Sequence, residues 1–181
     1  MLSDFRLKKV KRIFSFYDAN GNGVLDTGDI DGICHQFATE FGWPKGGEQA
    51  ILFRRTFTAH WNMLMHIADA NSDGVVTKEE FLKHYETAIG DDRGFYKFIK
   101  PFFDDIFPVI DADGDGVLSK KDYMALFRSF RNSPAEAEYA FQKMDLNGDG
   151  EISHYELYTM FYNFHMCEDR NHPSSFFYGH M

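Results

Sequence analysis

The sequence predicts an all-α fold in which four helix–loop–helix units form two pairs within one compact globule. Three observations support this prediction. A twelve-residue acidic motif occurs four times, beginning at residues 18, 69, 111 and 145. Segments with apolar residues three to four positions apart flank each copy, as expected for amphipathic helices. The chain has 181 residues, of which 20 are phenylalanine, enough for one sizeable core or two small ones that share a face.

The four copies of the motif share one pattern. They read DANGNGVLDTGD, DANSDGVVTKEE, DADGDGVLSKKD and DLNGDGEISHYE. Each has Asp at position 1, Asp or Asn at positions 3 and 5, Gly at position 6, an aliphatic residue at position 8, and an acid at position 12. This is the pattern of the EF-hand calcium loop, in which six to eight oxygens bind a hard divalent cation. The helix–loop–helix units are therefore called hands 1 to 4.

The predicted ligands of each loop are the side chains at positions 1, 3, 5, 9 and 12 and the backbone carbonyl at position 7. Carboxylates this close repel one another, and a bound cation relieves that repulsion. Glycine at position 6 permits the left-handed backbone that turns the carbonyl of position 7 toward the ion. The predicted ligands are Asp18, Asn20, Asn22, Val24, Asp26 and Asp29; Asp69, Asn71, Asp73, Val75, Thr77 and Glu80; Asp111, Asp113, Asp115, Val117, Ser119 and Asp122; and Asp145, Asn147, Asp149, Glu151, Ser153 and Glu156.

The helices of hands 1 and 2 are predicted from apolar spacing and turn residues. Ser3 is the expected N-cap of a helix that runs to Tyr17. Helical spacing resumes after the first loop and ends at the turn sequence GWPKGG, residues 42–47. The next helix covers residues 48–68, with its core-facing side formed by Ile51, Leu52, Trp61, Leu64, Met65 and Ala68. The helix after the second loop carries Phe81, Leu82, Tyr85 and Ile89.

Residues 91–94 are the predicted break between an N-terminal pair of hands, residues 1–90, and a C-terminal pair, residues 95–181. This segment is too short for a long exposed connecting helix, so we expect the two pairs to pack together. Ser133-Pro134-Ala135-Glu136 is a capping box that opens a helix of hand 4. The residues at position 8 should join the loops of each pair through a short β-bridge; they are Leu25, Val76, Leu118 and Ile152.

The four loops differ at position 12. Glu80 and Glu156 reach the ion with both carboxylate oxygens, which gives seven ligands. Asp29 and Asp122 are shorter by one methylene, so coordination falls toward six, which calcium tolerates and magnesium prefers. We therefore expect up to four calcium ions, with magnesium also able to bind hands 1 and 3.

The composition indicates which partners and which cellular compartment to expect. A formal net charge of −9 disfavours binding to nucleic acid or to an anionic membrane. Four divalent cations would reduce that charge to about −1, since the acidity lies mostly in the four loops. No secretory signal and no stretch of about 20 apolar residues is present. We expect a cytoplasmic monomer whose two cysteines, Cys34 and Cys167, are free thiols, with a disulfide between them as the alternative.

Several segments outside the loops resemble one family. The opening LSDFRLKKVKRIFSFYDANGNGV, the segment KPFFDDIF and the ending SSFFYGHM are similar to segments of the invertebrate sarcoplasmic calcium-binding proteins and of calexcitin. This resemblance implies a compact four-hand globule that acts as a cytosolic calcium and magnesium buffer or, for calexcitin, as a sensor. Family members commonly have one degenerate hand, whereas all four loops keep the ligand pattern here.

Three functions follow as alternatives. A calcium and magnesium buffer agrees best with the phenylalanine-rich core, which is costly to expose. A calcium sensor that binds a protein target is the second interpretation, although the methionines are scattered. The third is a protein like the calcium-triggered photoproteins, which resemble this fold and hold a peroxidised luciferin beside His, Tyr and Trp; His165 and Tyr178 are the residues that the tail offers for this. Ser, His and Asp form no recognisable hydrolytic signature, so we expect no enzyme.

Overall fold

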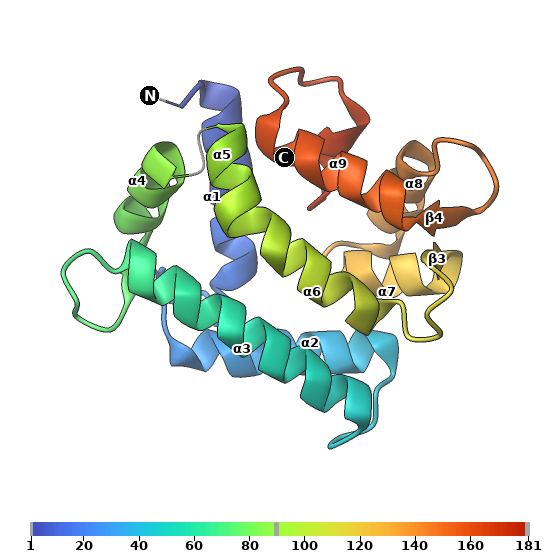
Figure 1. The fold of residues 1–181 in the computed structure, drawn as a ribbon, viewed down its shortest axis with the longest axis horizontal. Helices are drawn as coiled ribbons and strands as arrows, with labels where there is room; N and C mark the ends of the chain where they lie inside the picture. The colour runs from blue at the N-terminus through green and yellow to red at the C-terminus, as the bar shows by residue number, and fades with distance from the viewer. Residues whose placement is uncertain (1, 89–90, 180–181) are drawn as a thin grey trace.

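The computed structural model describes residues 2–88 and 91–179. Helices dominate both halves of the chain (Figure 1). The N-terminal half contains α1 (Asp4–Tyr17), β1 (Val24–Leu25), α2 (Thr27–Phe41), α3 (Glu48–Ala68), β2 (Val76–Thr77) and α4 (Lys78–Ala88). The C-terminal half contains α5 (Asp92–Gly94), a π-helix η1 (Phe95–Ile99), α6 (Lys100–Ile110), β3 (Val117–Ser119), α7 (Lys120–Ser129), α8 (Pro134–Met144), β4 (Glu151–Ser153), α9 (His154–Met166) and a 3-10 helix η2 (Pro173–Phe176). The predicted all-α class is confirmed.

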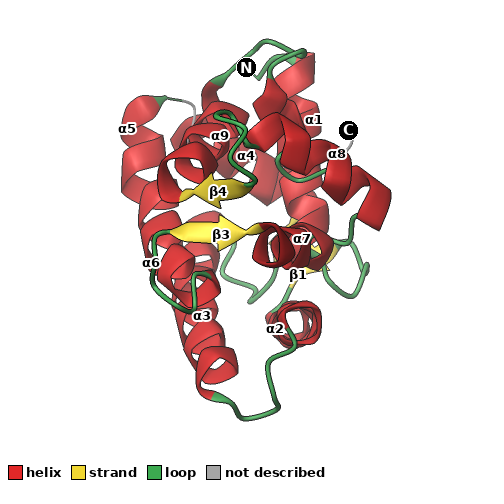
Figure 2. Cartoon of the chain, turned by 90° about the vertical axis from the view of Figure 1, so that its right-hand side faces the viewer, coloured by secondary structure: helices red, strands yellow, loops and turns green. Residues whose placement is uncertain are grey.

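The strands join the loops in the predicted pairs. β1 pairs antiparallel with β2, and β3 pairs antiparallel with β4, as Figure 2 shows for the second pair. In this register Leu25 lies opposite Val76 and Leu118 lies opposite Ile152. All four of these side chains are completely buried. The position-8 residues therefore close the two loops of each pair over the core, as the sequence predicts.

Helix ends follow local capping chemistry. The Ser3 hydroxyl accepts a hydrogen bond from the amide of Arg6 at 3.1 Å, and Ser133 forms a capping box with Glu136. Both predicted helix starts are therefore confirmed. At the end of α2, Gly42 adopts a left-handed backbone with φ of 68°, which a residue without Cβ does at little cost.

One sequence prediction about the helices is wrong. Ile51, expected in the core, is 59% exposed, because α3 buries the stripe that carries Phe53 and Phe57 instead. Within the predicted break between the pairs, residues 92–94 form a helical turn: the Asp91 carboxylate accepts a hydrogen bond from the amide of Gly94 at 2.9 Å and caps the turn that continues into η1 and α6. Ile89 lies outside the described residues.

The two halves share one aromatic core. α2 packs against α7 and α3 packs against α6, which crosses the middle of the molecule in Figure 1. Phe130, after α7, meets Phe37 of α2 with 6.2 Å between ring centroids, and Phe57 of α3 meets Phe102 of α6 at 6.1 Å. The expectation of packed halves is confirmed, since rings from both halves interlock.

The C-terminal tail belongs to the same core. Phe177 and Tyr178 are buried, and the guanidinium of Arg12 on α1 donates to the backbone carbonyl of Tyr178 at 2.7 Å. Cys34 and Cys167 are free, as predicted. Among the described residues, no helix combines the length and apolar character needed to cross a membrane.

Candidate metal centre

The first carboxylate of every loop sits at the end of the helix that leads into it. These aspartates follow the last residues of α1, α3, α6 and α8 and form the C-caps of those helices; they are Asp18, Asp69, Asp111 and Asp145. In each loop, the amide of the position-6 glycine donates to this carboxylate at 3.0–3.1 Å; the donors are Gly23, Gly74, Gly116 and Gly150. The bond draws the chain around the carboxylate, which shapes the loop into a cup.

The side chains at positions 3 and 5 turn into the same cup. In hands 1, 2 and 4 the carbonyl oxygen of the position-3 asparagine accepts the amide of position 5 at 2.9 Å. The position-5 side chain in turn accepts the amide of position 7 at 3.0–3.1 Å in all four loops. In hand 3, carboxylate oxygens of Asp111, Asp113 and Asp115 lie within 4.8 Å of one another. These oxygens converge as a hard cation requires.

Position 12 closes the cup in three of the four loops. Oε1 of Glu156 accepts the amide of Leu146 at 2.9 Å, and Oε1 of Glu80 accepts the amide of Ala70 at 3.2 Å. Asp29 also reaches across its loop, since its Oδ1 accepts the amide of Asn20 at 3.1 Å. The first loop therefore brings its start, at Asn20, close enough for the shorter side chain of Asp29 to bond it.

Asp122 of hand 3 behaves differently. Its carboxylate accepts a hydrogen bond from the hydroxyl of Ser119 at 2.5 Å, and within the described residues no bond from the start of the loop to this carboxylate is found. The difference between Asp29 and Asp122, which end their loops with the same residue type, is not visible in the motif.

Position 9 has a role that the motif analysis missed. Asp26, Ser119 and Ser153 are the N-caps of α2, α7 and α9. The Thr77 hydroxyl likewise accepts the amide of Glu80, at 3.3 Å. The sequence did contain the pattern that predicts this role. A capping box has a cap residue such as Ser or Thr followed three residues later by an acid, and positions 9 and 12 have this spacing. Position 9 thus fixes the start of the exit helix and, with it, the acid of position 12.

Hand 1 contains two direct signs that a cation fits. Oδ1 of Asp18 is buried and has no hydrogen-bond partner within the described residues. Asp29 is completely buried, and this burial raises the pKa of its carboxyl group above the ordinary value. A buried anionic oxygen without a partner is costly, and a divalent cation at this place removes that cost.

In hand 2, the position-12 acid is held in its charged form by hydrogen bonds. The amide and the hydroxyl of Thr77 donate to Oε2 of Glu80 at 2.9 and 2.8 Å. These bonds lower the pKa of Glu80 below the ordinary value. The carboxylate is therefore ionised before any ion arrives.

The backbone at position 4 is left-handed in every loop. Three loops place glycine there, whereas hand 2 has Ser72 with φ of 60°. We expect Ser72→Gly to raise the free energy of unfolding by about 0.5–1 kcal/mol, because glycine adopts this backbone without steric cost. Chemical denaturation of the calcium-free protein measures the change. Ser72→Ala keeps a Cβ and should give no gain; an equal gain in both variants would contradict this explanation.

Most of the chain matches a known protein family. The family, described as "EF-hand domain pair", matches residues 7–86 and 99–162. The chain belongs to the EF-hand family. Each matched segment of this EF-hand protein contains two of the four loops, in agreement with the pairing of the strands.

Relatives of this EF-hand protein are calcium-binding proteins. It is 29% identical to calerythrin of Saccharopolyspora erythraea, covering 87% of this chain and 90% of the relative. It is 30% identical to sarcoplasmic calcium-binding protein 1 of Astacus leptodactylus, covering 87% of each. Among solved structures, the calcium-loaded coelenterazine-binding protein of Renilla muelleri shares the fold, with a TM-score of 0.78, 20% identity, and 99% and 100% of the two chains covered. The predicted resemblance to sarcoplasmic calcium-binding proteins and calexcitin is confirmed.

Proposed function

We propose that this protein is a cytoplasmic buffer of calcium and magnesium that acts as a monomer. The observation that carries the proposal is the closed aromatic contact between the two halves. Glu40 of α2 and Arg128 of α7 form an ion pair at 2.7 Å, and the rings of Phe37 on α2 and Phe130 after α7 are in contact with each other. A sensor must expose an apolar groove for its target. Opening this contact would expose aromatic rings on both sides, which opposes such a change.

We propose that all four loops bind ions through the ligands predicted above. The converging carboxylate oxygens of Asp111, Asp113 and Asp115 in hand 3 and the buried, unpartnered Asp18 oxygen in hand 1 support this assignment. Hands 2 and 4 then select calcium, because a glutamate ends each loop. Hand 3 accepts magnesium as well, since Asp122 is bonded to Ser119 rather than across the loop. Hand 1 is intermediate in its selectivity for calcium. Asp29 is the shorter acid, and yet its carboxylate accepts a hydrogen bond from the amide of Asn20 across the loop.

Calorimetric titration with calcium, in the presence and absence of millimolar magnesium, tests the proposal. A buffer should bind up to four calcium ions. Magnesium should reduce the heat of calcium binding at the hands that accept both ions. An apolar dye such as anilinonaphthalene sulfonate, added to the same samples, should give no calcium-dependent rise in fluorescence. A large rise at constant magnesium would favour the sensor with a protein target instead.

Exchanging the acids at position 12 tests the selectivity of individual hands. We expect Asp122→Glu to raise the calcium-over-magnesium preference of hand 3 by roughly tenfold, because the longer side chain offers both oxygens. Glu80→Asp in hand 2 is the reciprocal change and should lower the preference there. Competition between the two ions in calorimetry measures both. Unchanged competition in both variants would refute the role assigned to side-chain length.

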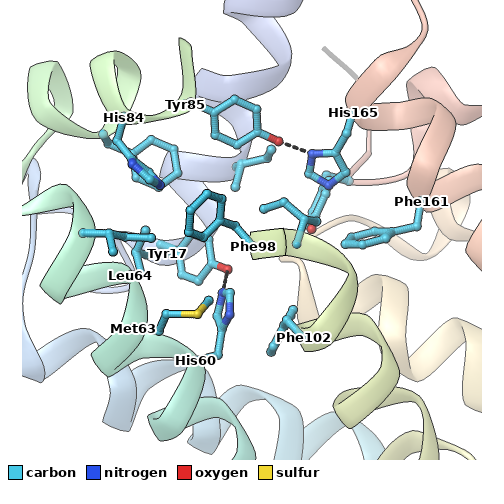
Figure 3. A pocket seen from close by; sticks show the side chains of 15 residues that line it. Tyr17, His60, Met63, Leu64, His84, Tyr85, Phe98, Phe102, Phe161 and His165 are labelled. Carbon is cyan, nitrogen blue, oxygen red and sulfur yellow. Dashed lines mark hydrogen bonds between the residues drawn. The ribbon is translucent and has the colours of Figure 1, made fainter. Parts of the chain in front are cut away.

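A photoprotein-like role in binding coelenterazine has weaker support. The similarity to the Renilla protein is one of fold, at 20% identity. Within the described residues, two cavities in the aromatic core, the first of which is shown in Figure 3, measure about 30 and 40 Å³, which is too little for a large luciferin unless core side chains move. Incubation with coelenterazine and oxygen followed by calcium should therefore produce no light.

A further inference from the structure

Three asparagines in the acidic loops directly precede a glycine. They are Asn20 and Asn22 in hand 1 and Asn147 in hand 4. All three, and the glycines that follow them, are exposed. An asparagine in this position can lose its side-chain amide, because a following glycine has no Cβ to obstruct the approach of its backbone nitrogen to the asparagine Cγ. The three pairs have the same two residues, so any difference in their reactivity comes from the structure.

The reaction consumes water and releases ammonia. The amide nitrogen of the glycine gives its proton to base in the solvent and forms a bond to Cγ of the asparagine. The bond from Cγ to Nδ2 then breaks, and Nδ2 leaves as ammonia after it takes up a proton. Water opens the resulting cyclic succinimide at either carbonyl, which yields aspartate or isoaspartate. The glycine nitrogen and the asparagine side chain must therefore both be free of other hydrogen bonds.

The glycine nitrogens differ in their hydrogen bonds. In hand 4, the amide of Gly148 donates to Oδ1 of Asp145 at 2.7 Å. In hand 1, the amide of Gly23 donates to Oδ2 of Asp18 at 3.1 Å. The amide of Gly21, by contrast, forms no hydrogen bond within the described residues. The acceptor that would match the one in hand 4 is Oδ1 of Asp18, and this is the buried oxygen that has no partner there.

The asparagine side chains differ in the same direction. Oδ1 of Asn147 accepts the amide of Asp149 at 2.9 Å, and its Nδ2 donates to the carboxylate of Asp149 at 2.8 Å. Asn22 is also held at both ends, since its Oδ1 accepts the amide of position 7 and its Nδ2 donates to Asp26, both at 3.0 Å. Oδ1 of Asn20 accepts the amide of Asn22 at 2.9 Å, but its Nδ2 has no acceptor in the described part of the chain.

The residue at position 5 explains why the Asn20 side chain is held at one end only. In hands 2 and 4 an aspartate at position 5 accepts Nδ2 of the position-3 asparagine, at 3.0 and 2.8 Å. Hand 1 has asparagine at both positions, so position 5 offers Asn20 no carboxylate. Asn20 and Gly21 are therefore the least restrained of the three pairs.

We propose that Asn20 is the preferred site of spontaneous deamidation in this protein. When the product is aspartate, the reaction adds a negative charge at position 3 of hand 1, where hand 3 already has Asp113. When the product is isoaspartate, the reaction inserts an additional carbon into the backbone of the loop and displaces the residues that follow. Hand 1 is thus the loop whose chemistry changes first as the protein ages.

Incubation of the calcium-free full chain in mildly alkaline buffer tests the proposal. Tandem mass spectrometry locates the modified residue, and the released ammonia gives the total. We expect deamidation at Asn20 to be roughly tenfold faster than at Asn22 or Asn147, because those two sites must first break hydrogen bonds. In concentrated urea, where these bonds are lost, the three rates should become similar. Circular dichroism of the same samples compares the helix content of the two conditions.

A matched pair of variants separates the three sites by a second readout. Asn20→Gln should remove most of the ammonia released by the folded chain, because glutamine would have to close a larger ring. Asn147→Gln is the control and should leave the release almost unchanged. Equal rates at the three sites of the calcium-free wild type, or a faster reaction at Asn22 or Asn147, would overturn the proposal. The wild-type measurement decides the question even if a variant fails to fold.

The effect of calcium on this reaction rests on the proposed function, in which Asn20 is a ligand of hand 1. Saturating calcium should slow deamidation at Asn20 by about tenfold or more, since its side chain must leave the ion before it can react. Absence of protection, with the order of rates intact in calcium-free protein, would count against an ion at hand 1 and leave the preference for Asn20 standing.

Discussion

Glu156→Gln is expected to abolish useful calcium binding at hand 4, weakening it by roughly 100-fold or more, because the loop loses a charged ligand that reaches the ion with two oxygens. Glu156 is almost completely buried, and its oxygens accept the amides of Leu146 and Ser153, both at 2.9 Å. The glutamine amide group has one acceptor oxygen instead of two, so one of these two hydrogen bonds is also lost.

Calorimetric titration of this variant should find one ion fewer than in the wild type at micromolar calcium. Glu151→Gln provides the matched control in the same loop. Glu151 occupies position 7, where the backbone carbonyl is the proposed ligand, and its side chain is exposed. The control removes the same charge and should retain its full number of ions. Equal losses in the two variants would show that net charge, rather than coordination, governs the site.

Phe57→Ala is expected to lower the free energy of unfolding by about 3–5 kcal/mol, the range for removing a buried phenylalanine ring. Phe57 is completely buried and lies at the contact of the two halves. Its ring centroid is 6.1 Å from that of Tyr17 on α1 and 6.1 Å from that of Phe102 on α6. Because the core is shared, we propose that the N-terminal and C-terminal pairs unfold together.

Denaturant unfolding followed by circular dichroism and by tryptophan fluorescence measures this change. The two probes should give coincident transitions in the wild type and in the variant. Ile51→Ala on the same helix is the control; its side chain is 59% exposed, so the loss should stay within about 0.5 kcal/mol. Two separated transitions in the calcium-saturated wild type would argue for independent pairs.

Much of the candidate metal centre follows from the sequence without a structure. The ligand positions lie within twelve consecutive residues, and the geometry of such a loop depends mainly on short-range hydrogen bonds. The bond from the amide of Gly150 to Asp145, for example, spans only five residues. The strand pairs could also be predicted, because every loop has an aliphatic residue at position 8 that must leave water, even though the paired residues are distant in sequence.

Other features depended on contacts between distant residues. The apolar spacing of α3 allowed Ile51 to face inward, and only packing against α6 selected the stripe of Phe53 and Phe57 instead. Likewise, Asp29 and Asp122 are the same residue at the same motif position, yet only Asp29 bonds across its loop.

The amino-acid sequence alone determined the four acidic loops and the helical class, because these depend on side-chain chemistry and backbone preference over a few neighbouring residues, and the repeated aliphatic residue at position 8 indicated how the loops pair. Tertiary structure decided which side chains form the shared core and placed His60 beside Tyr17 and His165 beside Tyr85, partners that are 43 and 80 residues apart. Burial at those places comes from the way the helices of both halves pack together, and local spacing carries no information about it.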